Sequence, residues 1–528
     1  MEIQHPLVLS ALYAEVHYAL YGIFSLLKKP QPEVLADAPY RVEPSTEIPI
    51  LCLVKDADRY PIRMRKITLG VSYPSGCFQE FSFDFDETVK ERCWHRILAF
   101  YPLEEGPVAI DVLFHFRDKR GDHRVRNDNY RGTSHAPLKV FVAGYSLPKS
   151  EGWYYGEAHY HTIYTDDQVE FGLPIQATAT LARAMGLSWA VATDHSYDLD
   201  NFPGDPSRND PYLSSWNRMK EEVAALNSDR DNFTLLIGEE ISCRNGSGRN
   251  VHLLGYKMTD FIEGSGDSAE RWPDTASELS IPEALLRIHR DGGVAYAAHP
   301  CETWPWLQRL LLGRGRWSRK DLKEDLLSGL QFWNGEKGGG FERGRKEWIR
   351  LLLEGKRIFA LGGNDAHGNF NRSRKIGLPF LTIRESNKHL FGRVRNCLFI
   401  RGELTTNNVF SALREGNLIV TNGPFVAISL RNEMGREAIV GEQIDGKDMR
   451  LKVEPRTTAE FGPFEVIDVL RGRIRARQEQ IFKRLKWNDG KKVFVLRFKA
   501  KGPSYIRVEA RTRKGALCIT NPIWINRS

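Results

Sequence analysis

Histidine and carboxylate side chains, which bind divalent transition metals, stand at the ends of several apolar runs between residues 155 and 367. His159 and His161 alternate across one residue, so on an extended segment both imidazoles would reach one cation. Any one of these residues alone is equally well explained as a hydrogen-bonded core side chain. Six of the 14 histidines follow the pattern, however, and their joint occurrence predicts one metal site. The candidates are His159, His161, Asp166, His195, Glu240, His252, His299, Asp365 and His367.

Two pairs of neighbouring residues in this region need a structural explanation. Asp194 and His195 end an apolar run, where a buried ionisable pair would be costly without a partner. Glu239 and Glu240 follow the apolar run 233–237, and adjacent residues of a strand point to opposite faces. One glutamate can therefore face the site while the other orients a ligand or lies on the surface. The sequence leaves open which glutamate does which.

The predicted ligand set indicates a type of chemistry. Imidazole and carboxylate ligands together suit Zn, Mn or Fe. Two such cations about 3.5–4 Å apart can share a hydroxide that attacks in line while both ions stabilise the developing negative charge. Metal binding lowers the pKa of water toward about 7, so no separate strong base is needed. The pattern therefore predicts a hydrolase that depends on divalent metal ions.

The order of the motifs resembles a known family. Between residues 155 and 370 the chain reads H-x-H-x(4)-D, T-D-H, G-x-E, x-H, A-H-P and G-x-D-x-H, which resembles the PHP (polymerase and histidinol phosphatase) superfamily. The flanking β-rich regions, with T-N-G-P at 421–424 and T-N-P-I-W-I at 520–525, resemble the carbaryl-hydrolase type of PHP metallohydrolase. The resemblance implies an α/β fold with a distorted (β/α)7 barrel, flanked by N-terminal and C-terminal β-sandwich-like domains. It also implies up to three Zn, Mn or Fe ions at the carboxyl ends of the barrel strands.

The same resemblance implies a ligand set for each ion. The first ion would be bound by His159, His161, Glu240 and Asp365. Glu240 would bridge to a second ion with the ligands His252 and His299. The third ion would be bound by Asp166, His195 and His367.

Other residues beside these motifs have predicted supporting roles. Asp194 is next to a ligand and could orient it. Arg372 and Arg374 follow the last motif and are candidates for gripping an anionic substrate, although solvated loop cations would look the same. Asp167 stands where the family has glycine, and its extra carboxylate would alter the loop or repel a multiply charged phosphate.

A phosphoesterase is the leading functional prediction, acting on a small-molecule or nucleotide-like anionic substrate. A carbamate, ester or amide hydrolase is one alternative, and a 5'-3' exonuclease or nucleotide phosphatase is another. A non-enzymatic alternative is a polymer-binding module in which the metals only staple the fold. Nine ligands exceed the four that a structural site usually needs, which favours an enzyme.

The elements that would position this site fall into three predicted domains. Residues 1–148 combine an N-terminal helix over 6–27 with short alternating strands typical of a β-sandwich. Residues 149–416 repeat strand, loop and helix, which predicts a parallel sheet or barrel. Two insertions there, 201–231 and 301–325, hold tryptophans that could shape a pocket or pin the loops down. Residues 417–528 return to strands.

Composition and charge limit the class of protein. With 528 residues, 41% of them hydrophobic and 27% charged, the chain is an ordinary globular protein of several domains. Seven scattered cysteines without paired spacing favour a reducing, cytoplasmic location, and the apolar run 6–27 is too interrupted for a membrane span. Residues 451–528 hold 19 Lys/Arg and 7 Asp/Glu, so 19 − 7 gives +12, which is weak support for a nucleic-acid partner. The oligomeric state is not predicted.

Overall fold

The computed structural model describes residues 31–129, 135–165, 171–203, 205–229, 232–266, 275–304, 306–372, 375–378, 381–384, 389–487 and 493–526. The predicted N-terminal helix over 6–27 lies outside these residues. The chain forms two compact units. The first unit comprises Met1–Ser146, Asp167–Gly186 and Gly368–Leu390. The second unit comprises Leu147–Asp166, Leu187–His367 and Phe391–Ser528.

The first unit is built from two sheets whose apolar faces share one core. One sheet has the order β1 (Glu33–Asp37), β3 (Ile48–Lys55) and β6 (Cys93–Phe100). The other has the order β2 (Arg41–Val42), β9 (Leu138–Val142), β7 (Gly106–Asp118), β4 (Ile62–Ser72) and β5 (Phe78–Val89), with β8 (Gly121–Arg126) paired to β7. Helix α2 (Ile175–Ala184) packs against β3, which explains why every residue of β3 is buried.

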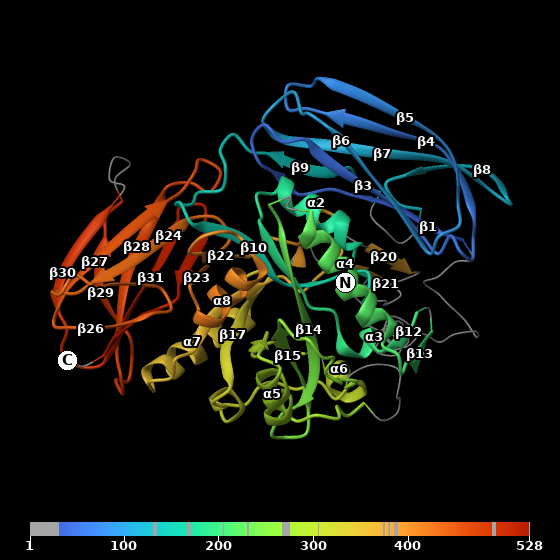
Figure 1. Cartoon of the computed structure of the whole chain (residues 1–528). Helices are drawn as coiled ribbons and strands as arrows, with labels where there is room; N and C mark the ends of the chain where they lie inside the picture. The colour runs from blue at the N-terminus through green and yellow to red at the C-terminus, as the bar shows by residue number, and fades with distance from the viewer. Residues whose placement is uncertain are drawn as a thin grey trace. The chain divides into compact units, whose positions relative to one another are not determined.

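The second unit contains one long mixed sheet (Figure 1). Its order begins β18 (Phe359–Gly363), β17 (Leu327–Asn334), β16 (Val294–Ala298), β15 (Asn250–Tyr256), β14 (Thr234–Arg244), β11 (Trp189–Ala192) and β10 (Trp153–His161). It continues through β22 (Arg395–Phe399), β23 (Leu418–Thr421), β32 (Leu517–Thr520), β31 (Ser504–Thr512), β28 (Phe464–Arg473) and β29 (Gln480–Leu485). The short β19 (Ala366–His367) pairs with β10.

The prediction of an α/β fold with a distorted (β/α)7 barrel is wrong. β15 runs antiparallel to both of its neighbours, β14 and β16, and β22 runs antiparallel to β10. Beyond β22 the sheet passes into C-terminal strands instead of closing through further parallel strands. The physical reason is the turn Asn245–Arg249, which joins β14 to β15 as a hairpin and leaves no room for a crossover helix. Strands, not alternating helices, therefore dominate the described residues.

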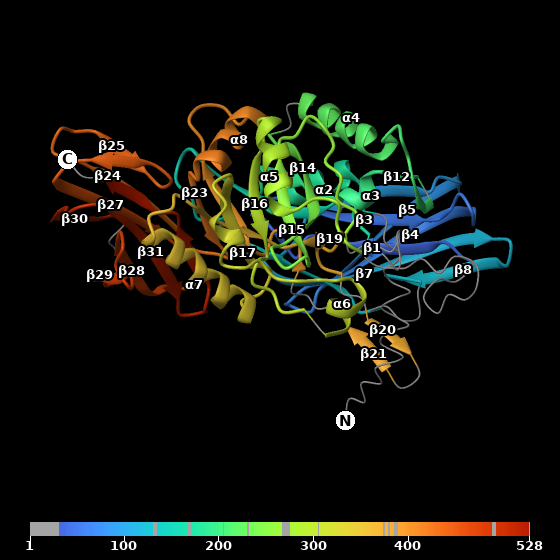
Figure 2. The ribbon, with the colours of Figure 1, turned by 90° about the horizontal axis from the view of Figure 1, so that it is seen from below.

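Few helices cover this sheet, and their sequence signals are clear. Helix α5 (Ile281–Arg290) begins at a capping box formed by Ser280 and Glu283. Helix α7 (Gly339–Leu353) packs on β17 (Figure 1), and α5 packs on β16 (Figure 2). The described part of this unit also contains α3 (Ser196–Leu199), α4 (Ser214–Ser228), α6 (Trp306–Leu311) and α8 (Thr406–Glu415), with a 3-10 turn at Asp321–Lys323. Among the described residues, no helix combines the length and apolar character that crossing a membrane requires.

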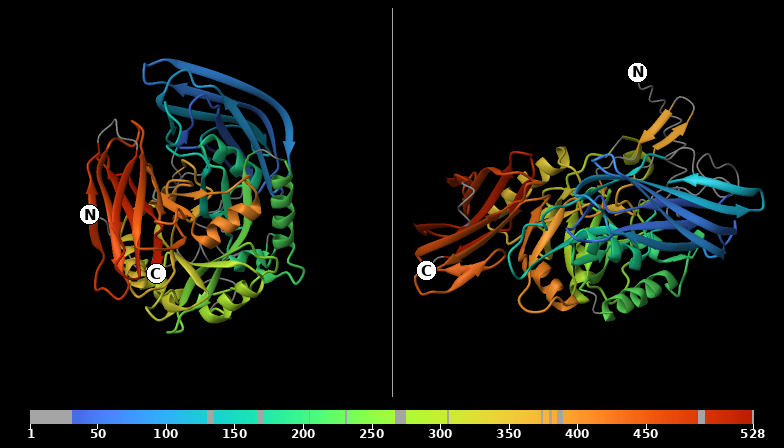
Figure 3. Two further views of the ribbon diagram at one scale, coloured as in Figure 1. Left: turned by 60° about the vertical axis from the view of Figure 1, so that its left-hand side comes forward. Right: turned by 90° about the horizontal axis from the view of Figure 1, so that it is seen from above.

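The C-terminal strands belong to the same unit as the residues that precede them. Gly416, at the predicted boundary after 416, ends α8 in the left-handed conformation (φ 68°), and the chain enters β23 two residues later. β23 then pairs with both β22 and β32. A second sheet has the order β25 (Glu437–Ile439), β24 (Phe425–Arg431), β27 (Asp448–Arg456) and β30 (Phe494–Lys499), which Figure 2 labels. Figure 3 shows the C-terminal strands, in orange and red, from two further sides.

Short strands complete the described secondary structure. β26 (Gln443–Asp445) and β33 (Ile523–Asn526) pair with each other in the second unit, and β12 (Asn201–Phe202) pairs with β13 (Asp205–Asn209). β20 (Lys375–Leu378) and β21 (Leu381–Arg384) form a hairpin in the first unit.

A buried ion-pair network links α7 to β31. The Arg507 guanidinium is fully buried and lies 2.6 Å from Glu479 and 2.6 Å from Glu509, and Glu509 also pairs with Arg345. Burial alone would raise the pKa of Glu509, but Arg507 and Arg345 outweigh it and lower that pKa from 4.5 to about 2. The folded protein therefore favours charged over protonated Glu509 by on the order of 3 kcal/mol.

This network predicts a stability loss in acid. The contribution of Glu509 is complete above its unfolded pKa of 4.5 and disappears as the pH falls toward about 2. The free energy of unfolding, measured by urea titration from pH 7 to pH 2, should fall through this window. Glu509→Gln should be less stable at pH 7 and should show a flatter fall. An unchanged pH profile in that variant would assign the acid sensitivity to other groups.

Candidate metal centre

Side chains from successive strands of the second unit meet at one end of its sheet. His159 and His161 share a face at the end of β10, and His195 follows β11. Glu240 lies in β14 and pairs with His195 through a parallel bridge, which places their side chains together. His252 lies in β15, His299 follows β16, and Asp365 and His367 lie at β19. The structure thus brings together eight of the nine predicted ligands; the ninth, Asp166, lies outside the described residues.

The Glu240 carboxylate is the centre of this group. It is completely buried, and five imidazoles from four other strands or strand ends surround it. Glu240 Oε2 lies 3.3 Å from His159 Nε2, 3.3 Å from His161 Nε2 and 3.2 Å from His195 Nδ1. Glu240 Oε1 lies 2.7 Å from His252 Nδ1 and 3.1 Å from His299 Nε2. One carboxylate in contact with so many imidazoles has the geometry of a bridging metal ligand.

Asp365 adds a second carboxylate. Its Oδ1 lies 3.3 Å from His159 Nε2 and 3.1 Å from His161 Nε2. Asp365 has a left-handed backbone (φ 52°), as does His299 (φ 29°), and its N–H donates to the His159 carbonyl over 2.9 Å. Non-glycine residues in this conformation are strained, and such strain gathers at functional sites. The bond to His159 holds Asp365 in place against that strain.

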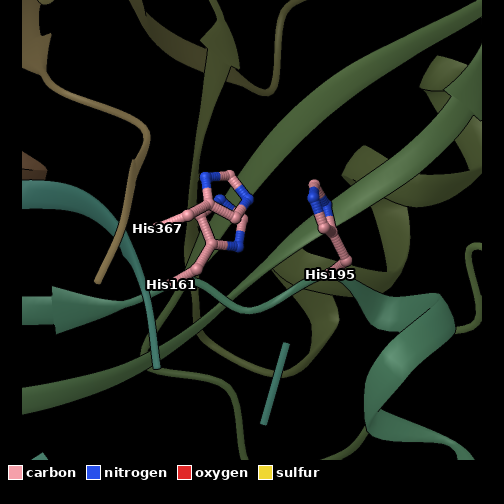
Figure 4. Close-up of side chains that lie close together, drawn as sticks. All are labelled: His161, His195 and His367. Atoms are coloured by element: carbon pink, nitrogen blue, oxygen red, sulfur yellow. The ribbon is translucent and has the colours of Figure 1, made fainter. Parts of the chain in front are cut away.

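Three histidines form the outer side of the centre. The rings of His161 and His367 stack with their centroids 4.0 Å apart, and His195 lies 4.4 Å from His161 (Figure 4). The three rings come from β10, β19 and the start of α3. Figure 4 shows His195 facing the other two rings across a small gap. This group matches the predicted third site, apart from Asp166.

The residues present fit divalent cations. Three overlapping groups have ligand atoms within 4.8 Å of one another. Among the described residues, buried His159 Nε2, His195 Nδ1 and Glu240 Oε2 have no hydrogen-bond partner. Leaving such atoms unsatisfied is costly, and bound cations would satisfy them, because Glu240 belongs to one ligand group with His159 and to another with His195. The groups are His159, His161, Glu240 and Asp365; His195, Glu240 and His252; and His161, His195 and His367.

The electrostatics favour an anionic Glu240 among basic ligands. Burial would raise the pKa of Glu240, but His252 and His159 outweigh it and hold that pKa well below its usual range. Burial and the charge of His161 hold the pKa of His195 well below its usual range, so His195 is neutral. Burial lowers the pKa of His161, while Asp365 and Glu240 raise it more, to about 10. The two carboxylates thus require positive charge beside them, which a divalent cation supplies.

The structure also decides between the two neighbouring glutamates. Glu239 points away from the centre, where its carboxyl accepts from Ser196 Oγ at 2.9 Å and from the Ile262 N–H at 3.2 Å. Burial raises the pKa of Glu239 well above its usual value, so its side chain is a neutral acid. Glu240 is therefore the residue that faces the histidines.

Gln331 orients His159 and His299, a role that the sequence analysis did not predict. It is fully buried in β17, and its Oε1 accepts from His159 Nδ1 at 3.1 Å and from the His299 N–H at 3.0 Å. Its Nε2 donates to Asn334 Oδ1 at 3.0 Å. The bond to Nδ1 leaves His159 Nε2 free to bind a metal. A polar residue inside the apolar run L-Q-F-W was the available signal.

Asp194 orients the loop after β10. Its carboxylate accepts from the N–H and Oγ1 of both Thr162 and Thr165, over 2.7–3.0 Å. Because Thr165 Oγ1 donates to Asp194, it can accept from His161 Nδ1, 3.1 Å away. This chain directs His161 Nε2 toward Glu240. Asp194 thus positions His161 through Thr165. These four hydrogen bonds of its carboxylate go to the two threonines and not to a predicted metal ligand.

Asp194→Ala should weaken metal binding by roughly 10–100-fold, the usual cost of removing a group that orients a ligand. Asp194→Asn keeps the shape and most of the acceptors, so it should come closer to the original protein. Titration of metal-free protein with Zn or Mn, with unfolding measured in parallel, tests this expectation. Equal metal affinities in the Ala variant and the original protein would remove Asp194 from this role.

Of the two predicted arginine grips the structure describes Arg372, whose contacts with Asp37 and Phe171 lie within the first unit. Arg372 belongs to the first unit, where it is buried, its N–H donates to Asp37 at 3.1 Å, and its guanidinium lies 5.1 Å from the Phe171 ring. These contacts give Arg372 a structural role within that unit. Arg374 lies outside the described residues.

Aromatic side chains border the centre. Tyr197 stacks on His195 with centroids 4.6 Å apart, and Trp304 meets His299 edge-on at 5.6 Å. The guanidinium of Arg314 lies 4.6 Å over the Trp304 ring. Trp317 is buried and donates to the His252 carbonyl at 3.2 Å, so it fixes the insertion to β15. Of the tryptophans in the insertion 301–325, Trp304 thus contacts the predicted metal ligand His299, and Trp317 holds the insertion against β15.

No family model matches this chain, and no curated protein matches it. Solved structures with some similarity include a putative β-galactosidase from Bacteroides fragilis, with 9% identity and a TM-score of 0.19 over 94% of this chain and 73% of that chain. Another is a β-D-mannosidase from Dictyoglomus thermophilum, with 9% identity and a TM-score of 0.20 over 91% of this chain and 64% of that chain. At TM-scores this low, neither similarity supports a conclusion about fold or activity.

Proposed function

We propose that this protein is a metal-dependent hydrolase whose substrates are phosphoesters. The observation that carries the proposal is the buried Glu240 carboxylate in contact with five imidazoles, with ligand atoms of three of these residues lacking a hydrogen-bond partner among the described residues. A purely structural metal site needs about four ligands and closes around them. Here three overlapping ligand groups share residues, an arrangement suited to adjacent cations.

Two or three Zn, Mn or Fe ions are the proposed cofactors, because these metals accept mixed imidazole and carboxylate ligands. When bound, they would lower the pKa of water and stabilise negative charge on a reacting phosphoryl group. Adjacent metal pairs of this kind occur in phosphatases and nucleases, which is why phosphoesters are the proposed substrates. The motif resemblance to the PHP superfamily stays a prediction that no comparison tests.

The protein's own residues supply the positions and the charge. Glu240 stays anionic and belongs to two of the ligand groups. Gln331 and Thr165 fix which nitrogen of His159 and of His161 faces Glu240. Tyr197 and Trp304 cover two of the ligand rings and restrict access of bulk water to them. No separate side chain is needed as a strong base beside such cations.

Metal analysis and a substrate panel test the proposal. Freshly purified protein should contain two or three equivalents of Zn, Mn or Fe, and a chelator should remove activity that added Zn or Mn restores. The panel compares p-nitrophenyl phosphate, its bis-ester and a naphthyl methylcarbamate. Turnover of the carbamate alone would replace phosphoesters with carbamates as substrates. Metal retention without turnover of any of the three would favour the structural-metal alternative.

A further inference from the structure

A second pocket, of about 500 Å³, lies in the second unit between the last turns of α7 and the loop that joins β28 to β29. β17 runs toward the metal centre, where Gln331 contacts His159, and α7 then returns along the sheet. Because a 15-residue helix is about 22 Å long, the last turn of α7 lies at the opposite end of the sheet from the centre. The pocket is therefore distinct from the metal centre.

The acidic groups of the pocket are already neutralised within the protein. Glu479 pairs with the buried Arg507 at 2.6 Å. Glu354 pairs with Arg350 at 2.5 Å and with Lys323 at 3.0 Å. These carboxylates therefore do not offset the other cations that line the pocket.

Three cations remain for a ligand. Lys346 on α7 and Arg475 and Arg477 on the loop line the pocket. Among the described residues none of these three side chains has an ion pair or a hydrogen bond. All three are exposed to solvent. The pocket thus presents about three uncompensated positive charges to whatever enters it.

The loop holds these cations on a fixed backbone. Arg475 adopts the left-handed conformation (φ 69°), and its N–H donates to the Leu353 carbonyl at the end of α7 over 2.7 Å. Ile474 and Ala476, on either side, pack against the hydrophobic core. A strained residue anchored in this way is typical of a binding loop and differs from a solvated turn that carries charge only for solubility.

We propose that this pocket binds a small organic polyphosphate of nucleotide size. Arginine guanidinium groups bind phosphate oxygens in pairs, and two arginines with a lysine match a multiply charged phosphate chain. Ile349, Leu353 and Ala476 form an apolar wall that suits a planar organic group on the same molecule. The volume falls within the range of roughly 300–1,000 Å³ found for small-ligand sites. The proposal does not depend on the metal centre.

Binding of a fluorescent ADP derivative and of pyrophosphate to the full chain tests this site. The titrations use the Glu240→Gln background, in which the metal centre should no longer compete for phosphate, and both probes should still bind there because the pocket contains none of the metal-centre residues. Arg475→Gly combined with Arg477→Ala should weaken both probes by at least about tenfold, the loss expected for a charged hydrogen bond. Glycine suits the positive φ of residue 475, so the double variant should fold, as its thermal unfolding will show.

Arg513→Ala is the matched control, because Arg513 is an exposed cation of the same C-terminal region outside the pocket. It should change both affinities by less than about twofold. Equal weakening in the control would mean that the general positive field, not the pocket, binds phosphate. Absence of saturable binding of both probes would overturn the proposal. Binding of a single-stranded oligonucleotide alone, with steep salt dependence, would also overturn it, in favour of a nucleic-acid backbone.

Discussion

Glu240→Gln should abolish metal binding and hydrolysis together. The amide keeps the shape of the carboxylate but loses the negative charge that five imidazoles surround. The loss of metal affinity and of turnover should exceed the roughly 10–100-fold typical of residues that only orient a ligand. Elemental analysis of the purified variant and phosphoesterase kinetics measure the two effects.

The neighbouring acid provides the control for this substitution. Glu239 is equally buried, but it is a neutral group bonded to Ser196 and Ile262, so Glu239→Gln should retain both metal and activity. Thermal unfolding of both variants separates misfolding from loss of the site, because the amide introduced by Glu240→Gln can still bond to surrounding imidazoles. A Glu240→Gln variant with its full metal content and undiminished turnover would sink the proposed function.

Gln331→Leu should produce the next largest loss. Leucine has nearly the volume of glutamine but accepts no hydrogen bond, so His159 loses the partner of its Nδ1 and His299 loses the partner of its N–H. Metal affinity should fall by about 10–100-fold. The buried His299 N–H, left without an acceptor, should also lower the free energy of unfolding by about 1–3 kcal/mol. Isothermal titration with Zn or Mn and urea unfolding measure these changes.

Gln331→Glu is the rescue variant for this position, because it keeps the oxygen that accepts both bonds while removing the donor to Asn334. It should recover much of the metal affinity that the leucine variant loses. Wild-type metal affinity in Gln331→Leu would show that the strand backbones alone hold His159 and His299. That result would not affect the proposal that Glu240 binds metal, because the hydrogen bonds of Gln331 go to His159, His299 and Asn334.

Local pattern was enough to find residues that gather at the candidate metal centre, but not to arrange the fold around them. His159 and His161 share a face through the period of two of any strand, and His195 and His299 each follow an apolar run. Such features need only a few neighbouring residues. The barrel failed as a prediction because the chirality and direction of strands depend on the connections between them, and the short hairpin at Asn245–Arg249 reverses β15.

The roles of individual polar residues also depended on contacts between distant parts of the chain. Gln331 and His159 are 172 positions apart, yet their bond sets which nitrogen of the histidine faces the site. Arg372 follows soon after the last ligand motif in the sequence, but it is buried in the other compact unit. Its place in the sequence therefore did not reveal that Asp37, 335 positions away, is a hydrogen-bond partner of this arginine.

The sequence by itself determined which residue types could bind metal and that they lie in or beside strands, because both follow from side-chain chemistry and local periodicity. Only the tertiary structure decided that Glu240 rather than Glu239 faces the histidines, that Gln331 orients two of them, and that a mixed sheet carries the site. Each of these depends on which strands become neighbours and in which direction. Strand pairing depends on satisfying the buried hydrogen-bonding groups of the whole unit together. It therefore cannot be deduced from any single segment of the chain.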